Sequence, residues 1–252
     1  TMRKINLVKQ IVILGMLSVS FQTYSQSDIA ISFGWRNHFG GMDAVNNIIS
    51  QYNVTRPWLD NTLGTHNFQN GFEIGLERSG DKFGLSALKY YRVWKVSAAS
   101  GTTPRGEDIK RKLRTRVAGV EIIDFWYTPL NIKQHRIGFG VMPMALAKFR
   151  VHTKLNGAKW ERLALSDLEN STGFKGIWST LHAYSNLHTD YILPLGNVST
   201  LHFQIFASFN WFKDEYSLIY LNSAINPSTS GGSKFRLKHN QNNYGFKLTI
   251  SI

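Results

Sequence analysis

The segment HAYSN combines a histidine with a serine, the residue types that an acyl-transfer site uses as base and nucleophile. His182 and Ser185 are three residues apart, and in a β-strand that spacing places two side chains on opposite faces. A structural role for His182 is therefore favoured. The same residue types also occur in segments that read as loops, which keeps a loop-borne enzyme site as an alternative: His152, Ser166, Asp167 and Asp214.

The spacing of the other candidate residues does not favour metal or nucleotide chemistry. The eight histidines show no HExxH pattern. On one strand, His182 and His188 would lie about 20 Å apart, too far for a shared ion. The chain has no P-loop and no strand-to-helix GxGxxG motif, and it has no cysteine for a thiolate site, a disulfide or a lipoprotein anchor. We predict no cofactor, no metal and no nucleotide ligand.

Positive charge is the strongest functional signal. The formal net charge is +13, and an excess of this size predicts an anionic partner. Nucleic acid is disfavoured because the chain shows no zinc-finger spacing, no RNP-like motif and no basic helix with heptads. A phosphorylated lipid is therefore the expected partner.

The first 26 residues have the layout of a signal peptide. Arg3, Lys4 and Lys9 precede an apolar run over 11–21, which is too short to span a membrane, and small polar residues follow it. We expect cleavage near Ser25 to Ser27, which would lower the net charge by three; a retained anchor helix is the alternative. Residues 27–252 contain no linker and are expected to form one domain.

Apolar residues then recur with period two, the signature of β-strands. In residues 28–36, for example, Ile31, Phe33 and Trp35 share one face while small residues occupy the other. In residues 112–127 the phase is ambiguous because Glu121 and Asp124 fall on opposite faces, and a bulge is expected either there or in 82–96. The expected strands are 28–36, 67–78, 82–96, 112–127, 135–151, 174–191, 200–212 and 242–252.

The connections between these strands alternate in length. Short turns are expected at 78–82, 129–134 and 194–198, and long segments at 37–66, 97–111, 152–173 and 213–241. Short turns at one end and long loops at the other are typical of outer-membrane barrels. We therefore predict an all-β fold, an eight-stranded antiparallel up-and-down transmembrane barrel with long extracellular loops. Helical spacing in MDAVNNIISQYN predicts a short helix that caps the barrel mouth.

A barrel of eight strands has an interior just wide enough for side chains to fill. Charged groups placed there must pair, because an unpaired buried charge costs several kcal/mol. We predict a salt-bridged lumen, with a narrow passive channel along the same groups as the alternative. The expected lumen residues are Glu73, Glu77, Arg92, Arg136, His182, His188, Asp190 and Lys247. Aromatic residues near strand ends, Trp94 and Trp126 among them, predict interfacial girdles, although some could pack in the lumen.

Over residues 28–252 the chain resembles the small outer-membrane β-barrel proteins common in Bacteroidota. Its last strand, NNYGFKLTISI, is similar to the signal that barrel-assembly machinery reads, but it ends in Ile252 where many barrels of Proteobacteria end in an aromatic residue. The resemblance implies export to the outer membrane. Some small barrels modify the acyl chains of lipid A, which makes such an enzyme the main alternative to a non-enzymatic structural or accessory subunit.

In such a barrel the long basic segments would face the outer leaflet, where lipopolysaccharide carries phosphates and carboxylates. Guanidinium groups bind these anions through paired, charge-assisted hydrogen bonds. We therefore predict a rim that binds lipopolysaccharide or a partner protein of the outer membrane; solvated loops without a fixed partner are the alternative. The expected binding residues are Arg105, Lys110, Arg111, Lys112, Arg114, Arg116, Lys148 and Arg150.

Overall fold

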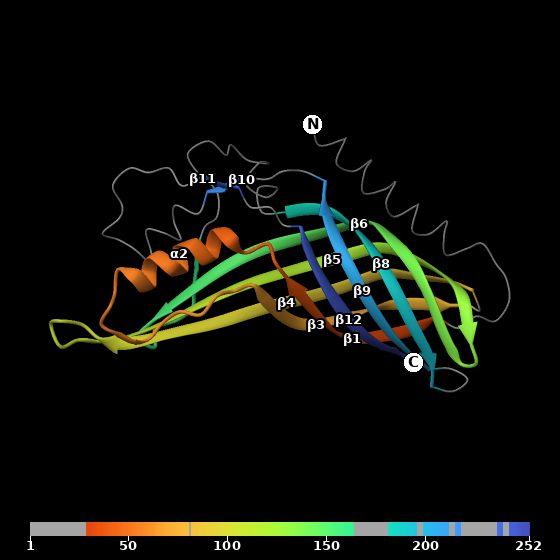
Figure 1. The fold of residues 1–252 in the computed structure, drawn as a ribbon, viewed down its shortest axis with the longest axis horizontal. Helices are drawn as coiled ribbons and strands as arrows, with labels where there is room; N and C mark the ends of the chain where they lie inside the picture. Colours follow the sequence, from red (N-terminus) through yellow and green to blue (C-terminus); the bar gives the residue numbers. More distant parts are fainter. Residues whose placement is uncertain are drawn as a thin grey trace.

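A closed ring of eight antiparallel strands forms the body of the protein (Figure 1). The computed structural model describes residues 29–80, 82–163, 181–195, 199–211, 215–217, 236–238 and 242–252, so the expected signal peptide lies outside the described residues. Each ring strand pairs with its neighbours along the chain, and the last pairs with the first. The ring strands are β1 (Ala30–Phe39), β3 (Phe68–Ser79), β4 (Phe83–Thr102), β5 (Asp108–Ile132), β6 (His135–Leu155), β8 (Leu181–Pro194), β9 (Thr200–Asn210) and β12 (Asn243–Ser251).

The predicted fold class is confirmed, and each of the eight expected strands corresponds to one strand of the ring. Five short elements lie outside the ring: α2 (Asp43–Val54), β2 (Leu59–Asn61), β7 (Glu161–Leu163), β10 (Glu215–Ser217) and β11 (Arg236–Lys238). No helix in the described part of the chain is long and apolar enough to cross a membrane.

The two faces of the barrel wall differ as strand alternation requires. On β1, Phe33 and Trp35 each keep half of their surface exposed, whereas Ser32 and Arg36 point inward and are buried. The same alternation continues around the ring, so exposed apolar side chains encircle the outer wall. Trp126 is an exception to the expected girdles, since it is buried inside the barrel. Gly84 leaves room for it, because a Cβ there would lie 2.0 Å from the indole.

Bulges at the same level of β4 and β5 explain the ambiguous phase of both segments. At this level the register of β4 against β3 shifts, and so does the register of β5 against β6. The pairing of β4 with β5 passes over Leu88 and residue 122, and Leu88 has a φ of 53°. Because an extra residue reverses the alternation, Glu121 and Asp124 both face the interior although they are three residues apart. One bulge was expected, and the structure contains one in each strand.

The second long loop, expected over 97–111, is instead a strand hairpin. β4 continues to Thr102 and β5 begins at Asp108, so these strands extend beyond the ring together with the end of β6 (Figure 1). β2 pairs with β4 and β7 pairs with β6, which widens this extension. We call it the projecting sheet: β2, β7 and residues 95–102, 108–116 and 149–155.

Helix α2 forms where helical spacing predicted it and packs on the inner face of the projecting sheet. Val45, Ile48 and Ile49 are buried and belong to one apolar cluster with side chains of the sheet. Those partners include Leu113 and Val151. A loop was expected over 97–111 because the small residues SAASGT show no apolar strand pattern. These residues form a strand whose inner face packs under α2, where small side chains are sufficient.

Candidate functional site

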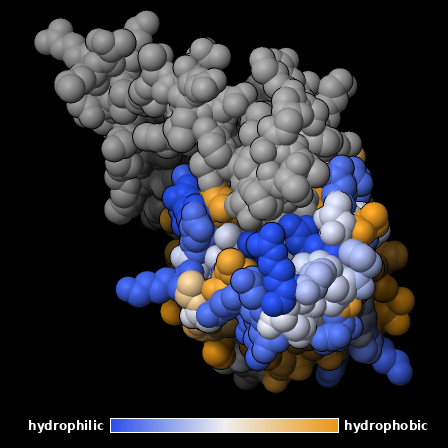
Figure 2. Space-filling view, turned by 90° about the vertical axis from the view of Figure 1, so that its left-hand side faces the viewer, coloured by the Kyte–Doolittle hydropathy of each residue, from blue (hydrophilic) through white to orange (hydrophobic). Residues whose placement is uncertain are grey.

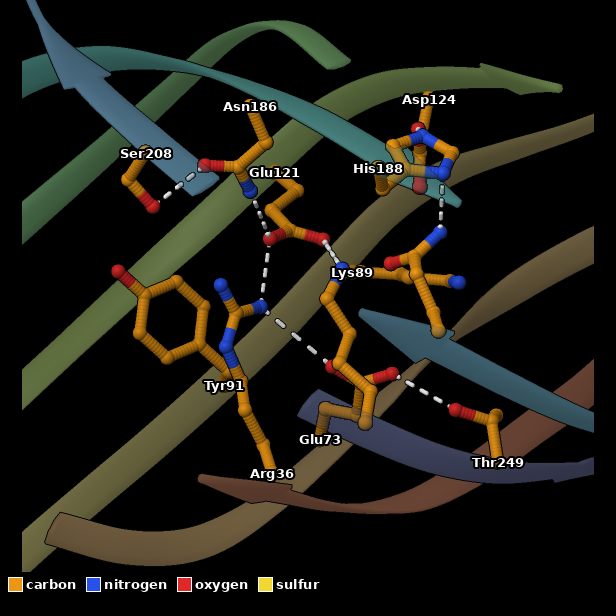
Figure 3. A network of polar contacts seen from close by, with 12 residues as sticks. Arg36, Glu73, Lys89, Tyr91, Glu121, Asp124, Asn186, His188, Ser208 and Thr249 are labelled. Atoms are coloured by element: carbon orange, nitrogen blue, oxygen red, sulfur yellow. Dashed lines mark hydrogen bonds and ion pairs between the residues drawn. The ribbon is translucent and has the colours of Figure 1, made fainter. Parts of the chain in front are cut away.

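Glu121 is the centre of an ion-paired network that fills the barrel (Figure 3). One of its carboxylate oxygens lies 2.5 Å from Nη1 of Arg36, and the other lies 2.9 Å from Nζ of Lys247. Arg36 also pairs with Glu73 at 3.4 Å, and Glu73 accepts a hydrogen bond from Thr249 at 2.9 Å. The strands β1, β3, β5 and β12 supply these side chains, so the network ties opposite parts of the wall together.

A second chain of contacts runs through two histidines toward the end of the barrel that carries the short turns. His188 lies between two carboxylates, 2.7 Å from Asp124 and 2.9 Å from Asp190. His202 bonds to Asp190 at 2.7 Å and lies 3.6 Å from Glu77. All the side chains that make these contacts are buried.

Five of the eight expected lumen residues lie within these contacts: Glu73, Glu77, His188, Asp190 and Lys247. Arg136 also shares the inner face, but it lies at the end of the barrel and donates a 2.6 Å hydrogen bond to the carbonyl of Gly80. The side chain of His182 lies outside the described residues.

Arg92 differs from the expectation, since it lies on the outer face of the wall. Its strand neighbour Tyr91 is buried in the interior, and its cross-strand partner Phe72 is exposed outward. The guanidinium lies 6.0 Å from the ring of Trp94 on the same outer face. The bulge at Leu88 causes the difference, because it reverses the phase of all later residues of β4.

Several lumen residues were not expected: Arg36, Lys89, Glu121, Asp124 and His202. Arg36 continues the polar face of residues 28–36, so its position was readable from the alternation. Lys89, Glu121 and Asp124 could not be placed on a face, because each lies next to a bulge. A bulge interrupts the alternation of inward and outward side chains from which a face is predicted.

Of the enzyme-like residues, Ser185 and His152 have described side chains. The hydroxyl of Ser185 donates to the carbonyl of Pro143 at 2.6 Å and accepts from the indole of Trp211 at 2.6 Å. Ser166, Asp167 and Asp214 lie outside the described residues. Within the described residues no group of three histidine or carboxylate side chains is placed to hold a metal.

A surface patch of positive charge occupies the outer face of β4, β5, β6 and β7, where cations lie in four successive cross-strand rows. The first row pairs Arg92 and Lys148 with Ala118, and the second pairs Arg116 with Arg150 beside Trp94. The third places His152 between Arg114 and Arg162, and the fourth pairs Lys112 with Lys154. We call this the basic wall patch: Arg92, Lys112, Arg114, Arg116, Lys148, Arg150, Lys154 and Arg162.

Like charges directly opposite each other destabilise a sheet. No described carboxylate lies within ion-pair distance of any member of the basic wall patch. Burial, and after it the surrounding arginines, lower the pKa of His152 to about 4. The patch therefore keeps its central histidine neutral at pH 7 and presents uncompensated positive charge on both sides of it.

Most of the expected binding residues lie in this patch, and the exceptions are clear. Arg111 faces the other side of the projecting sheet, where it donates to the hydroxyl of Thr153 at 3.0 Å and lies 5.8 Å from the ring of Tyr52. Arg105 is exposed in the β4–β5 turn. Lys110 lies on β5 two residues before Lys112, one row closer to that turn. Figure 2 looks onto this end of the molecule and shows hydrophilic side chains gathered over it, with hydrophobic ones at its flanks.

No known family and no curated protein matches the chain. Among solved structures it is similar to Ail, the attachment invasion locus protein of Yersinia pestis, with 5% identity over 90% of this chain and 97% of that chain, at a TM-score of 0.35. Ail in complex with the heparin analogue sucrose octasulfate gives 5% identity, the same coverage and a TM-score of 0.36. The outer membrane protein OprG from Pseudomonas aeruginosa gives 6% identity, coverage of 92% and 95%, and a TM-score of 0.37.

These similarities concern the overall architecture, and the roles of individual residues rest on the geometry above. The eight-stranded ring is consistent with the expected class of small β-barrels. The expected tie to Bacteroidota stays a prediction.

Proposed function

We propose that this protein is a non-enzymatic outer-membrane barrel, a structural or accessory subunit that holds lipopolysaccharide against its outer wall. The observation that carries the proposal is the basic wall patch, in which Arg116 faces Arg150 and Lys112 faces Lys154 across neighbouring strands. Repulsion within these pairs has to be offset by an anion, and no described side chain supplies one.

The closed ring and its apolar outer belt support the location in a membrane. Backbone polar groups in a bilayer must be satisfied internally, and a closed barrel does this without a free edge. The half-exposed side chains Phe33, Trp35 and Ile205 lie on the outside of a wall whose interior is charged. This polarity is the reverse of that of a barrel in water, and a bilayer is the solvent that it fits.

The position of the patch supports lipopolysaccharide as the anion. Its second row lies level with Trp94 on the outer wall, where the projecting sheet begins, and its higher rows lie farther out on that sheet. Interfacial tryptophans lie at headgroup depth, so these cations are at the depth of phosphorylated headgroups and just beyond it. Two arginines in this row suit phosphate, since a guanidinium bonds a phosphate through two parallel hydrogen bonds.

The test is to purify the full chain from outer membranes in mild detergent and to measure copurifying lipopolysaccharide. The variant carries Arg116→Ser with Arg150→Ser. Because hydrogen bonds to charged groups contribute about 1.5–3 kcal/mol each, we expect at least a tenfold loss of bound lipopolysaccharide.

The matched control removes two exposed cations near the short turns, Lys82→Ser with Lys133→Ser, and should leave the bound amount unchanged. Equal amounts of lipopolysaccharide on the wall variant and the wild type would contradict the proposal. Stoichiometric partner proteins recovered with the wild type and lost with the wall variant would assign the patch to a protein instead.

A further inference from the structure

The cations of the basic wall patch lie at several levels along the strands. Alternate residues of a strand rise by about 7 Å, so the distance from the row of Arg116 to the row of Lys112 is about 14 Å. Across the strands, each of the rows of Arg116 and Lys112 places its two cations on the neighbouring strands β5 and β6. A single phosphate group contacts one level of this patch and leaves the other level unneutralised.

The patch has a lower and an upper level, and the row of His152 begins the upper one. The side chain of His152 is 8% exposed on the outer face and lies between Arg114 and Arg162. Below it, Arg92, Arg116, Lys148 and Arg150 surround the level of Trp94. In the same row as His152, Arg114 lies 4.5 Å from the ring of Trp160, which restricts the guanidinium, and in the next row Lys112 pairs with Lys154.

We propose that the two levels bind two different anionic parts of one lipopolysaccharide molecule: the lower level binds a phosphate of lipid A, and the upper level binds the acidic inner sugars. This inference rests on the proposed function and deepens it. It assigns a ligand that carries charge at two depths, and it excludes ordinary phospholipids, whose phosphate lies at one depth only.

The experiment compares three lipids on the purified full chain: deep-rough lipopolysaccharide, which carries acidic inner sugars, bare diphosphorylated lipid A, and phosphatidylglycerol. Two variants remove two charges each, Lys112→Ser with Lys154→Ser in the upper level and Arg116→Ser with Arg150→Ser in the lower level. Wild type should bind deep-rough lipopolysaccharide at least tenfold more tightly than lipid A, and phosphatidylglycerol most weakly.

The upper variant should bind lipid A as wild type does and lose the preference for the inner sugars. The lower variant should lose affinity for both. An upper variant that keeps the full preference, or a wild type without any preference between the two, overturns the two-level assignment while leaving lipopolysaccharide binding in place. A wild type that binds none of the three lipids overturns the proposed function itself.

His152 offers a second readout that does not depend on affinity. An anion in the upper level offsets the positive potential of the arginines around the imidazole. The pKa of His152 should therefore rise from about 4 when deep-rough lipopolysaccharide binds, and it should rise less with lipid A. Histidine-labelled NMR spectra over pH, with a His152→Gln variant to assign the signal, measure this shift; equal shifts with both lipids would contradict the assignment.

Discussion

At the scale of single residues, Glu121 is the group on which the interior depends most. Its carboxylate neutralises Arg36 and Lys247 at 2.5 and 2.9 Å, and all three side chains are almost fully buried. Loss of one partner leaves buried charge without compensation, which costs about 3–5 kcal/mol. We expect Glu121→Gln to lower the free energy of unfolding by this amount, measured by urea titration of tryptophan fluorescence in lipid vesicles.

A matched control for this variant is Glu107→Gln, which removes the same charge in the exposed β4–β5 turn and should change little. Combining Glu121→Gln with Lys247→Met removes one of the stranded cations and should recover part of the lost stability. If the double variant is no more stable than Glu121→Gln alone, charge pairing is not what holds this part of the lumen together.

At the scale of elements, helix α2 is expected to hold the projecting sheet in place. Val45 is fully buried between the helix and the sheet, so Val45→Asp would place a carboxylate among apolar side chains. We expect the helix to detach and the hairpin around Arg105 to become at least tenfold more sensitive to trypsin, which corresponds to about 1.4 kcal/mol of local stability or more.

The control for α2 is Asn47→Asp, which adds the same charge on the exposed face of the same helix. The ring should survive both changes, because α2 contributes no residue to it. Unfolding of the whole barrel by Val45→Asp would mean that the helix and the ring form one cooperative unit, contrary to this expectation.

The elements also show how much of the structure was predictable. A barrel wall must place apolar and polar residues alternately, so sequence alternation was enough to predict eight strands and to place Glu73 and Lys247 inside. The paired bulges could not be predicted, because residues added at the same level of β4 and β5 preserve their pairing while reversing both phases. Arg92 was therefore placed on the wrong face, and Lys89 was not predicted as a lumen residue.

The projecting sheet was unpredictable for a different physical reason. Residues 97–102 are small, and in isolation they carry no apolar face that separates a strand from a loop. Their pairing with β5 and the apolar surface of α2 supply that information, and both are distant in the sequence. The cationic rows of the basic wall patch emerge only from this pairing, since Arg116 and Arg150 are 34 positions apart.

At the scale of the whole molecule, the lumen is expected to be closed to ions. Charged side chains cross the interior from four strands around Glu121, and the apolar cluster under α2 covers the network at the end of the projecting sheet. A permeating ion would have to break buried ion pairs and then pass an apolar layer, and each step costs several kcal/mol. Purified protein in planar bilayers should therefore show no discrete openings, with insertion verified by co-flotation with liposomes. Regular steps of uniform conductance, absent from bilayers that receive detergent alone, would mean that the network opens and that the passive-channel alternative describes the protein better than a closed barrel.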